Sequence, residues 1–251
     1  MRNDTIRPMV NVLSVAATIV MNILANALPF NGQNTGEISD RFQVFFVPAG
    51  YVFSIWGLIY IGWIAFAVYQ ALPAQRANPR LQKLGYWFAL SGVFNSLWLL
   101  CWHYNLFGLS VLVMLALLAT LIVSYLRLDV GRAVVSPAER WCVDTPFSIY
   151  LGWITVATVA NVTDWLYFVQ WSGWGIAAPT WAVIMLVVAS LPGLLMALTR
   201  RDAGYLFVLV WSFAGIGVKQ SAFPVVATSA WAASALAFGL AVFSLLLRRA
   251  Q

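Results

Sequence analysis

The sequence predicts an all-α integral membrane protein whose chain crosses the bilayer eight times. Composition, the length of the apolar runs and the placement of the cations lead to this fold class. Hydrophobic residues make up 62% of the chain and charged residues only 9%, whereas a soluble domain carries roughly 25% charged residues. This number of charged residues is too small to cover a surface in water, which indicates that the protein is surrounded by lipid. The composition therefore excludes a soluble enzyme.

Eight apolar runs follow one another along the chain. Each except the short seventh is close to the ~20 residues that a helix needs to cross the hydrocarbon core. Continuous runs also disfavour a β-barrel, whose strands alternate over segments of ~10 residues. The predicted spans are about 8–29, 47–71, 84–103, 107–126, 145–168, 177–198, 204–219 and 223–247.

The cations divide twelve to two between the faces of this eight-span arrangement, with only Arg41 and Lys219 on the minor side. Cytoplasmic loops are enriched in Lys and Arg, so the split predicts a plasma (bacterial inner) membrane protein with both termini in the cytoplasm. Six spans would keep the same even count and remain the alternative. The cations form no long basic run, so nucleic acid is not a predicted partner. The twelve are Arg2, Arg7, Arg76, Arg80, Lys83, Arg127, Arg132, Arg140, Arg200, Arg201, Arg248 and Arg249.

The first span carries a polar stripe of Ser14, Thr18, Asn22 and Asn26, each four residues after the last. Such a stripe lies on one slowly drifting helix face. It must face protein or a wet cavity, because lipid cannot satisfy an amide. Contacts that only hold helices together are the alternative to a binding role.

Aromatic and amide side chains share one face in the second, third and fifth spans. Aromatic stripes are most often packing, but three helices that combine indole and amide groups favour a shared aromatic cavity. The residues are Trp56, Tyr60 and Trp63, then Ser91, Asn95, Trp98 and Trp102, then Thr155, Thr158, Asn161 and Trp165.

The remaining spans carry weaker signals. The connectors 104–106 and 171–178 carry no cations, whereas residues 31–46 form a polar outer loop that is long enough to have a function. Gly215 and Gly217 allow the short seventh span to pack closely or to kink.

Three stretches resemble the TspO/translocator-protein family, the tryptophan-rich sensory proteins. Pro48-Ala49-Gly50-Tyr51-Val52-Phe53 with Trp56 and Tyr60 is similar to the family's Pro-Pro-x-Trp-Val-Phe…Trp-x-x-x-Tyr. Asn95-x-x-Trp98 is similar to its Leu-Asn-x-x-Trp. Residues 150–161, Tyr-Leu-Gly-Trp-Ile-Thr-Val-Ala-Thr-Val-Ala-Asn, followed by Trp165, resemble its Tyr-Leu-Ala-Trp-Val-Thr-Phe-Ala-Thr-x-Leu-Asn.

The resemblance covers residues 8–168 and implies a five-helix TspO-like bundle over 1–168, with an additional three-helix unit over 169–251. It also implies a pocket for porphyrins and other flat apolar ligands under the loop 31–47, so a porphyrin or haem-type tetrapyrrole is the implied cofactor. Ala49 and Tyr51 replace the second Pro and the Trp of the signature, and one residue is missing between Phe53 and Trp56. These departures leave the identity of the ligand open.

The expected ligand-binding residues combine the polar stripe with the motif positions, and no catalytic or metal-binding set is predicted. They are Asn22, Asn26, Tyr51, Phe53, Trp56, Tyr60, Asn95, Trp98, Thr155, Thr158, Asn161 and Trp165.

Three further polar residues have open interpretations. His103 is the one histidine and could ligate a haem or chlorophyll metal, but interfacial polar residues are ordinary at the end of a span. Asp164 lies near the outer end of the fifth span, where an ionisable group is a functional hypothesis by default. Lys219 is expected on the same face, so a structural ion pair with Asp164 is the alternative.

The leading hypothesis is a membrane-embedded, non-catalytic protein that binds a tetrapyrrole or another flat apolar ligand, in a sensory, receptor or trafficking role. A transporter that uses the same cavity and a non-catalytic subunit of a larger membrane complex are the alternatives. Degradation of a bound porphyrin is a side activity that the resemblance leaves open. The bilayer and the small ligand are the expected partners, with a homodimer or a membrane complex as further options.

Overall fold

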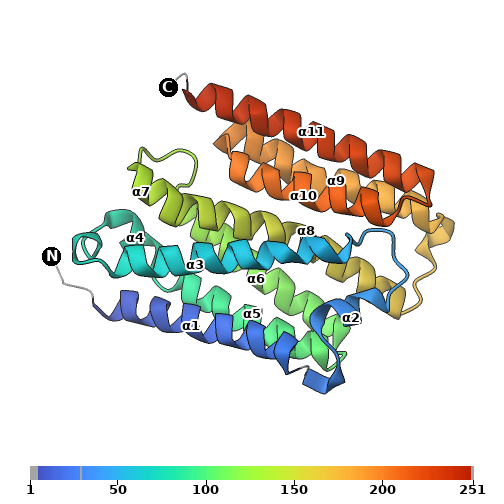
Figure 1. The fold of residues 1–251 in the computed structure, drawn as a ribbon, viewed down its shortest axis with the longest axis horizontal. Coiled ribbons are helices and arrows are strands. Elements are labelled where there is room, and N and C mark those ends of the chain that lie inside the picture. The colour runs from blue at the N-terminus through green and yellow to red at the C-terminus, as the bar shows by residue number, and fades with distance from the viewer. Residues whose placement is uncertain (1–4, 29, 250–251) are drawn as a thin grey trace. The chain divides into compact units, whose positions relative to one another are not determined.

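The computed structural model describes residues 5–28 and 30–249. Eight long helices follow one another in the order of the eight predicted spans (Figure 1). No β-strand occurs among the described residues. The long helices are α1 (Ile6–Ala27), α3 (Ile55–Ala71), α5 (Trp87–His103), α6 (Phe107–Arg127), α8 (Thr145–Phe168), α9 (Ala178–Arg200), α10 (Ala203–Lys219) and α11 (Pro224–Arg249).

Eight short elements occupy the connections between the long helices. Most are single turns, and η4 is a π-helical turn that leads directly into α8. They are η1 (Phe30–Gly32), α2 (Thr35–Asp40), η2 (Gly50–Ser54), η3 (Pro73–Gln75), α4 (Pro79–Leu84), α7 (Pro137–Glu139), η4 (Arg140–Asp144) and η5 (Gly173–Gly175).

The lengths of the helices confirm the predicted class of all-α membrane protein. Helices α5 and α10, with 17 residues each, are shorter than the others. In the described part of the chain, six segments are long and apolar enough to cross a membrane. These are Ile6–Ala27, Gly50–Ala71, Phe107–Arg127, Pro137–Phe168, Ala178–Arg200 and Pro224–Leu247.

The second predicted span does not begin as an α-helix. Pro48 lacks a backbone N–H, and the 3₁₀ turn η2 precedes α3, which begins only at Ile55. The freed backbone at Ala49 donates its N–H to the Gly215 carbonyl of α10 at 3.1 Å. The motif segment 48–54 is therefore held by a neighbouring helix.

The residues form two compact units that do not follow chain order. The first consists of Met1–Thr35 and Ile55–Leu151, and the second of Gly36–Ser54 and Gly152–Gln251. Helix α8 contributes residues to both. Whether residues 1–168 fold as an autonomous bundle stays a prediction.

In the first unit, α1 packs on α3 and α5, and α5 packs on α6 (Figure 1). The contact between α1 and α5 is close at Gly92, where a Cβ atom would overlap Ser14 Oγ. Phe66, Phe88 and Phe147 form an aromatic core, with ring centroids 4.8 to 5.5 Å apart.

In the second unit, α10 contacts α9, α11 and η2. Glycines allow the close approach: a Cβ atom at Gly152 of α8 would lie 3.1 Å from the Tyr205 carbonyl, and one at Gly193 of α9 would overlap Leu209. The packed residues Ala197, Leu206 and Ala241 come from α9, α10 and α11. Helix α10 is therefore packed closely against α8, α9 and α11, while Phe207, Trp211 and Val218 stay exposed.

The cations gather at one end of the first unit, whereas in the second unit they lie at both ends of α10. In the first, Arg80 donates to the Leu128 carbonyl and Arg127 donates to the Lys83 carbonyl. In the second, Arg201 donates to the Leu247 carbonyl, and Lys219 lies at the opposite end of α10. The predicted topology also used Arg2 and the side chains of Arg248 and Arg249, which lie outside the described residues.

Candidate functional site

A chain of hydrogen bonds links three helices inside the first unit. Asn22 of α1 donates to Asn95 Oδ1 of α5 at 2.7 Å, and Asn95 donates to the Tyr150 hydroxyl of α8 at 3.2 Å. All three side chains are buried. An amide within a membrane span must find an internal partner. Asn22 and Asn95 are each other's hydrogen-bond partners.

Aromatic rings from α3 surround the end of this chain. Trp56, Tyr60 and Trp63 lie four and three residues apart, on one face of the helix. The Trp63 ring meets the Tyr150 ring edge to face, with centroids 4.8 Å apart, and Trp56 lies 6.3 Å from the same ring. Trp56 and Tyr60 are half-buried, whereas Trp63 is buried. We call Asn22, Asn95, Tyr150, Trp56, Tyr60 and Trp63 the aromatic–amide cluster.

Two groups of the cluster can still donate a hydrogen bond. The Tyr150 hydroxyl accepts from Asn95 and keeps its own proton. The Trp63 indole N–H is buried and has no hydrogen-bond partner among the described residues. The cluster therefore offers two donors beside aromatic walls, which suits a flat apolar molecule that carries acceptors.

Trp63 and Tyr150 were not among the expected ligand-binding residues. Trp63 follows Trp56 by seven residues, and this helical spacing is the sequence signal that could have placed Trp63 in the site. Tyr150 opens the motif Tyr-Leu-Gly-Trp in the fifth span. Its role depends on contacts with α3 and α5 that no spacing within α8 reveals.

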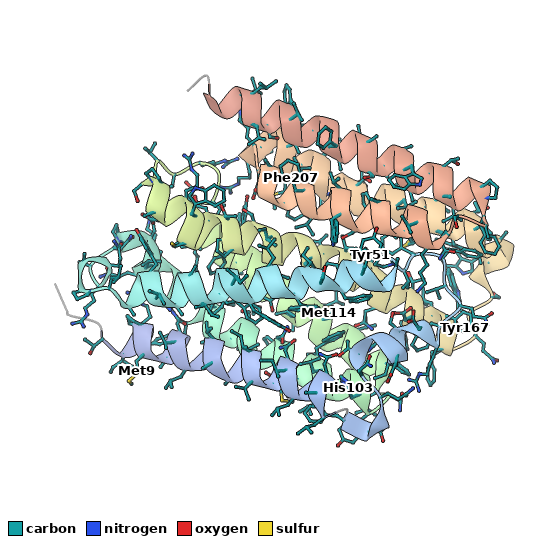
Figure 2. The ribbon with its side chains drawn as sticks, viewed as in Figure 1. Met9, Tyr51, His103, Met114, Tyr167 and Phe207 are labelled. Atoms are coloured by element: carbon teal, nitrogen blue, oxygen red, sulfur yellow. The ribbon has the colours of Figure 1, made fainter. Side chains whose placement is uncertain are left out.

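Further along α5, Trp98 stacks on Trp102 with ring centroids 5.7 Å apart. The Trp102 indole donates to the Thr35 carbonyl at 3.2 Å. His103 follows as the last residue of the helix and is buried (labelled in Figure 2). Asn26 is exposed, and its amide donates to the Asn22 carbonyl of its own helix at 2.9 Å.

The other expected ligand-binding residues belong to the second unit. Tyr51 is exposed and contacts the Trp211 ring of α10, and Phe53 meets the Trp153 ring of α8 (Tyr51 is labelled in Figure 2). Thr158, which is buried, donates to the carbonyl of Ile154 one turn earlier. The remaining three differ in burial: Asn161 is buried, and Thr155 and Trp165 are half-buried.

Lys219 pairs with Asp40 of α2, with 2.8 Å between Nζ and Oδ1. The direct ion pair of Lys219 is thus with Asp40 and not with Asp164, which was the alternative considered. Asp164 is 2% exposed, and its Oδ1 has no hydrogen-bond partner among the described residues. Helix spacing within α8 could not reveal this arrangement, because Asp40 comes from a distant segment of the chain.

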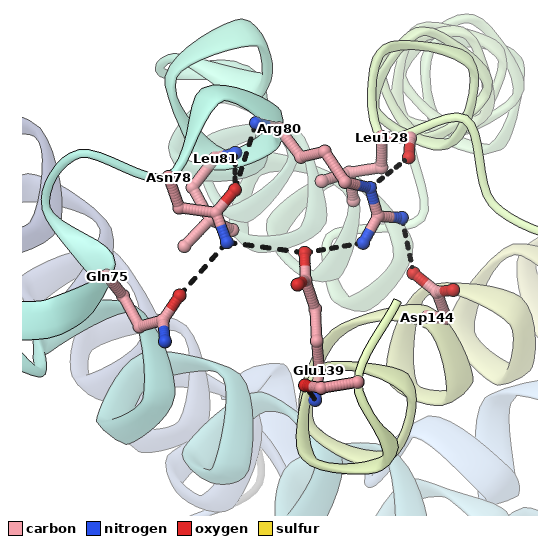
Figure 3. A network of polar contacts seen from close by, with 8 residues as sticks. Gln75, Asn78, Arg80, Leu81, Leu128, Glu139 and Asp144 are labelled. Atoms are coloured by element: carbon pink, nitrogen blue, oxygen red, sulfur yellow. Dashed lines mark hydrogen bonds and ion pairs between the residues drawn. The ribbon is translucent and has the colours of Figure 1, made fainter. Parts of the chain in front are cut away.

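A buried ionic network lies at the cation-rich end of the first unit (Figure 3). The Arg80 guanidinium pairs with Glu139 and with Asp144 Oδ1 at 2.7 Å, and its Nε donates to the Leu128 carbonyl. Burial would lower the pKa of Arg80, but hydrogen bonds and charge attraction from the two carboxylates outweigh it and raise this pKa above its usual value. The network joins α4 to the π-helical turn before α8.

A groove of about 440 Å³ lies among α9, α10 and α11 in the second unit. Leu and Val side chains line much of it, with the small residues Gly193, Ala233 and Ala237. The Ser190 hydroxyl in its wall donates to the Leu186 carbonyl of its own helix. The groove is thus apolar and contains none of the expected ligand-binding residues.

Fold and contacts together define a multi-pass α-helical membrane protein with an aromatic–amide cluster between its helices. The chain belongs to the TSPO-like protein family, whose model matches residues 8–243. The predicted resemblance to the TspO family is thereby confirmed. The match continues beyond residue 168 and includes α9, α10 and most of α11. No curated protein and no solved structure gives a significant match.

Proposed function

We propose that this protein binds a tetrapyrrole or a similar flat apolar ligand inside the membrane and acts in sensing or trafficking that ligand. The observation that carries the proposal is the aromatic–amide cluster on α1, α3, α5 and α8. Trp56 and Tyr60 provide half-buried ring surface, and Tyr150 and Trp63 provide unused donors. Binding sites for small ligands combine aromatic walls with a few polar anchors in this way.

The residues of the cluster fit the chemistry of a tetrapyrrole. Such a molecule has a broad apolar face, which suits indole and phenol rings, and its carboxylates and ring nitrogens accept hydrogen bonds. The orphaned N–H of Trp63 is the donor that remains to be satisfied. In this proposal the protein is a non-catalytic binding protein of the plasma membrane with both termini in the cytoplasm.

Replacing Asn95 or Trp98 with Ala tests the site. We expect at least about tenfold weaker binding of metal-free protoporphyrin, a loss of ~1.4 kcal/mol, because the polar chain or the stacked wall is removed. Tryptophan fluorescence quenching during a titration in detergent measures the affinity. Trp181→Ala and Trp231→Ala are the matched controls, because these tryptophans lie in α9 and α11 of the second unit and are not among the expected ligand-binding residues.

Trp56→Ala adds a variant with a smaller risk to folding, since this ring is half-buried. It should weaken binding while the unfolding temperature stays near that of the parent protein. Equal losses of affinity in the Asn95, Trp98 and Trp56 variants and in the two controls would indicate general destabilisation and count against a defined site.

A role as a non-catalytic subunit of a membrane complex is the second candidate. The apolar groove among α9, α10 and α11 favours it, because small residues at a helix surface allow close packing of another membrane segment. Purification from the native membrane in mild detergent distinguishes the two functions. A stoichiometric protein partner without a bound pigment would favour the subunit.

A further inference from the structure

The apolar groove of the second unit extends over about the depth of one membrane leaflet. Its lining in α9 runs from Val183 to Leu194, which corresponds to ~17 Å at 1.5 Å per residue. Half of a hydrocarbon core of about 30 Å is ~15 Å. Among the lining residues, Val187, Leu191 and Leu236 are more than half exposed, so the groove is open to the surroundings of the protein.

The lining suits an occupant without polar groups. Ser190 and Ser229 are its polar residues, and the Ser190 hydroxyl already donates to the Leu186 carbonyl of its own helix. Placing an unpaired polar group in such surroundings costs free energy. The part of a ligand that lies in the groove is therefore hydrocarbon.

The groove is too narrow to enclose another helix. Its volume of about 440 Å³, averaged over the ~17 Å of its length, gives a cross-section of ~26 Å². A helix with its side chains is ~10–12 Å across, which corresponds to at least ~80 Å². A second helix could insert only some of its side chains, whereas an extended acyl chain fits along the whole groove.

Two arginines lie beyond one end of the groove. Helix α9 ends at Arg200, which follows Leu194 by ~9 Å of helix, and Arg201 comes next. Arg201 donates to the Leu247 carbonyl at 3.4 Å, so its guanidinium links the ends of α9 and α11. Both arginines are half-buried, whereas the neighbouring Asp202 is buried as the cap of α10. The accessible charge at this end of the groove is thus positive.

We propose that the groove holds one acyl chain of a phospholipid with an anionic headgroup, whose phosphate lies at Arg200 and Arg201. The headgroup region of a bilayer is ~5–8 Å thick on each side, close to the ~9 Å between Leu194 and Arg200. Basic pockets between transmembrane helices bind anionic headgroups in this way. The site is separate from the aromatic–amide cluster and does not depend on the proposed function.

Native mass spectrometry of the full-length protein tests the site. The protein is delipidated in detergent and titrated with phosphatidylglycerol, or with phosphatidylcholine that has identical acyl chains. Ala233→Phe fills the groove, and Ala232→Phe is a second blocking variant at an exposed lining position. Ala235→Phe is the control for both, because Ala235 is exposed on the same helix but does not line the groove.

The double variant Arg200→Gln/Arg201→Gln removes the charge beyond the groove. Its control is Arg132→Gln/Arg140→Gln, which removes two exposed cations of the first unit. The predicted topology places all four arginines on the same side of the membrane, so both double variants change the charge of that side equally.

We expect the parent protein and both controls to bind one phosphatidylglycerol at least about tenfold more tightly than phosphatidylcholine, because each arginine near an anionic surface contributes about a factor of five. Arg200→Gln/Arg201→Gln should bind the two lipids equally. Ala232→Phe and Ala233→Phe should lose the tight site while their unfolding temperatures stay near that of the parent protein.

Equal binding of both lipids by the parent protein overturns the proposal, as does an unchanged preference in Arg200→Gln/Arg201→Gln. Equal effects of Ala232→Phe and Ala235→Phe would show that the bound lipid lies outside the groove. If the blocking variants instead dissociate an oligomer of the parent protein, the groove holds a second copy of the chain and the assignment of a lipid is wrong.

Discussion

Arg80 shows how much one half-buried side chain determines in this protein. Its guanidinium has a partner at each nitrogen: Glu139, Asp144 and the Leu128 carbonyl. Asn78 caps α4 and also donates to Glu139 at 3.4 Å (Figure 3). The guanidinium matches two carboxylates that would otherwise be buried close together.

We predict that Arg80→Ala lowers the free energy of unfolding by about 3 kcal/mol, because removing one partner leaves two uncompensated buried carboxylates. Denaturant titration in detergent micelles measures the loss. Arg76→Ala is the control, since it removes a cation four residues away on the same segment. A loss in Arg80→Ala no larger than in Arg76→Ala would mean that the network contributes little to stability.

Asn22 and Asn95 show which features of the candidate site can be predicted from single residues in the sequence. Because Asn22 and Asn95 lie within apolar runs, the sequence predicts that each amide has a hydrogen-bond partner inside the protein. That they bond to each other depends on how α1 and α5 approach at Gly92. Such a contact between residues 73 positions apart cannot be read from the periodicity of either helix.

Glycine determines how closely the elements of the second unit approach. Gly215 of α10 faces η2, where a Cβ atom would overlap the Val52 side chain and lie 3.2 Å from Pro48 Cβ. Trp211 adds a hydrogen bond from its indole to the Val52 carbonyl at 3.0 Å. The motif segment is thus seated on α10 through side-chain and backbone contacts.

We predict that Gly215→Ala destabilises the protein by about 1–3 kcal/mol, because the added methyl group forces a buried neighbour to move. Gly239→Ala in α11 is the matched control, since a Cβ atom there meets nothing within 4 Å. The control should be neutral or more stable, as Ala favours a helix interior over Gly by about 0.5–1 kcal/mol. Similar unfolding temperatures for both variants would contradict close packing at Gly215.

At the scale of elements, the eight apolar runs predicted eight helices because each must satisfy its backbone internally. Boundaries were less accurate where local chemistry competes with helix formation. Pro48 delays the start of α3 to residue 55, and Gly85, with φ of 61°, separates α4 from α5. The extension before α8 arises from the Ser136 cap and the π-helical turn, neither of which changes the apolar pattern.

For the whole molecule, the cation split predicts that residue 104 faces the outside and residue 134 the cytoplasm. Tyr104→Cys and Val134→Cys, in a background without Cys101 and Cys142, place single thiols at two exposed positions. A membrane-impermeant thiol reagent should label Tyr104→Cys in intact cells, and Val134→Cys only after the membrane is opened. Labelling of both in intact cells would exclude the predicted topology.

The short length of α10 has a consequence for the membrane around it. Its 17 residues span about 26 Å at 1.5 Å per residue, less than the hydrocarbon thickness of about 30 Å. A lipid-facing helix of this length would thin the bilayer. One side of α10 is exposed at Phe207, Trp211 and Val218. The ends of the helix have internal partners: Asp202 caps the first turn, and Gln220 donates to the Val44 and Phe45 carbonyls. The backbone groups at both ends of this short helix are therefore satisfied within the protein, although the helix is shorter than the hydrocarbon core.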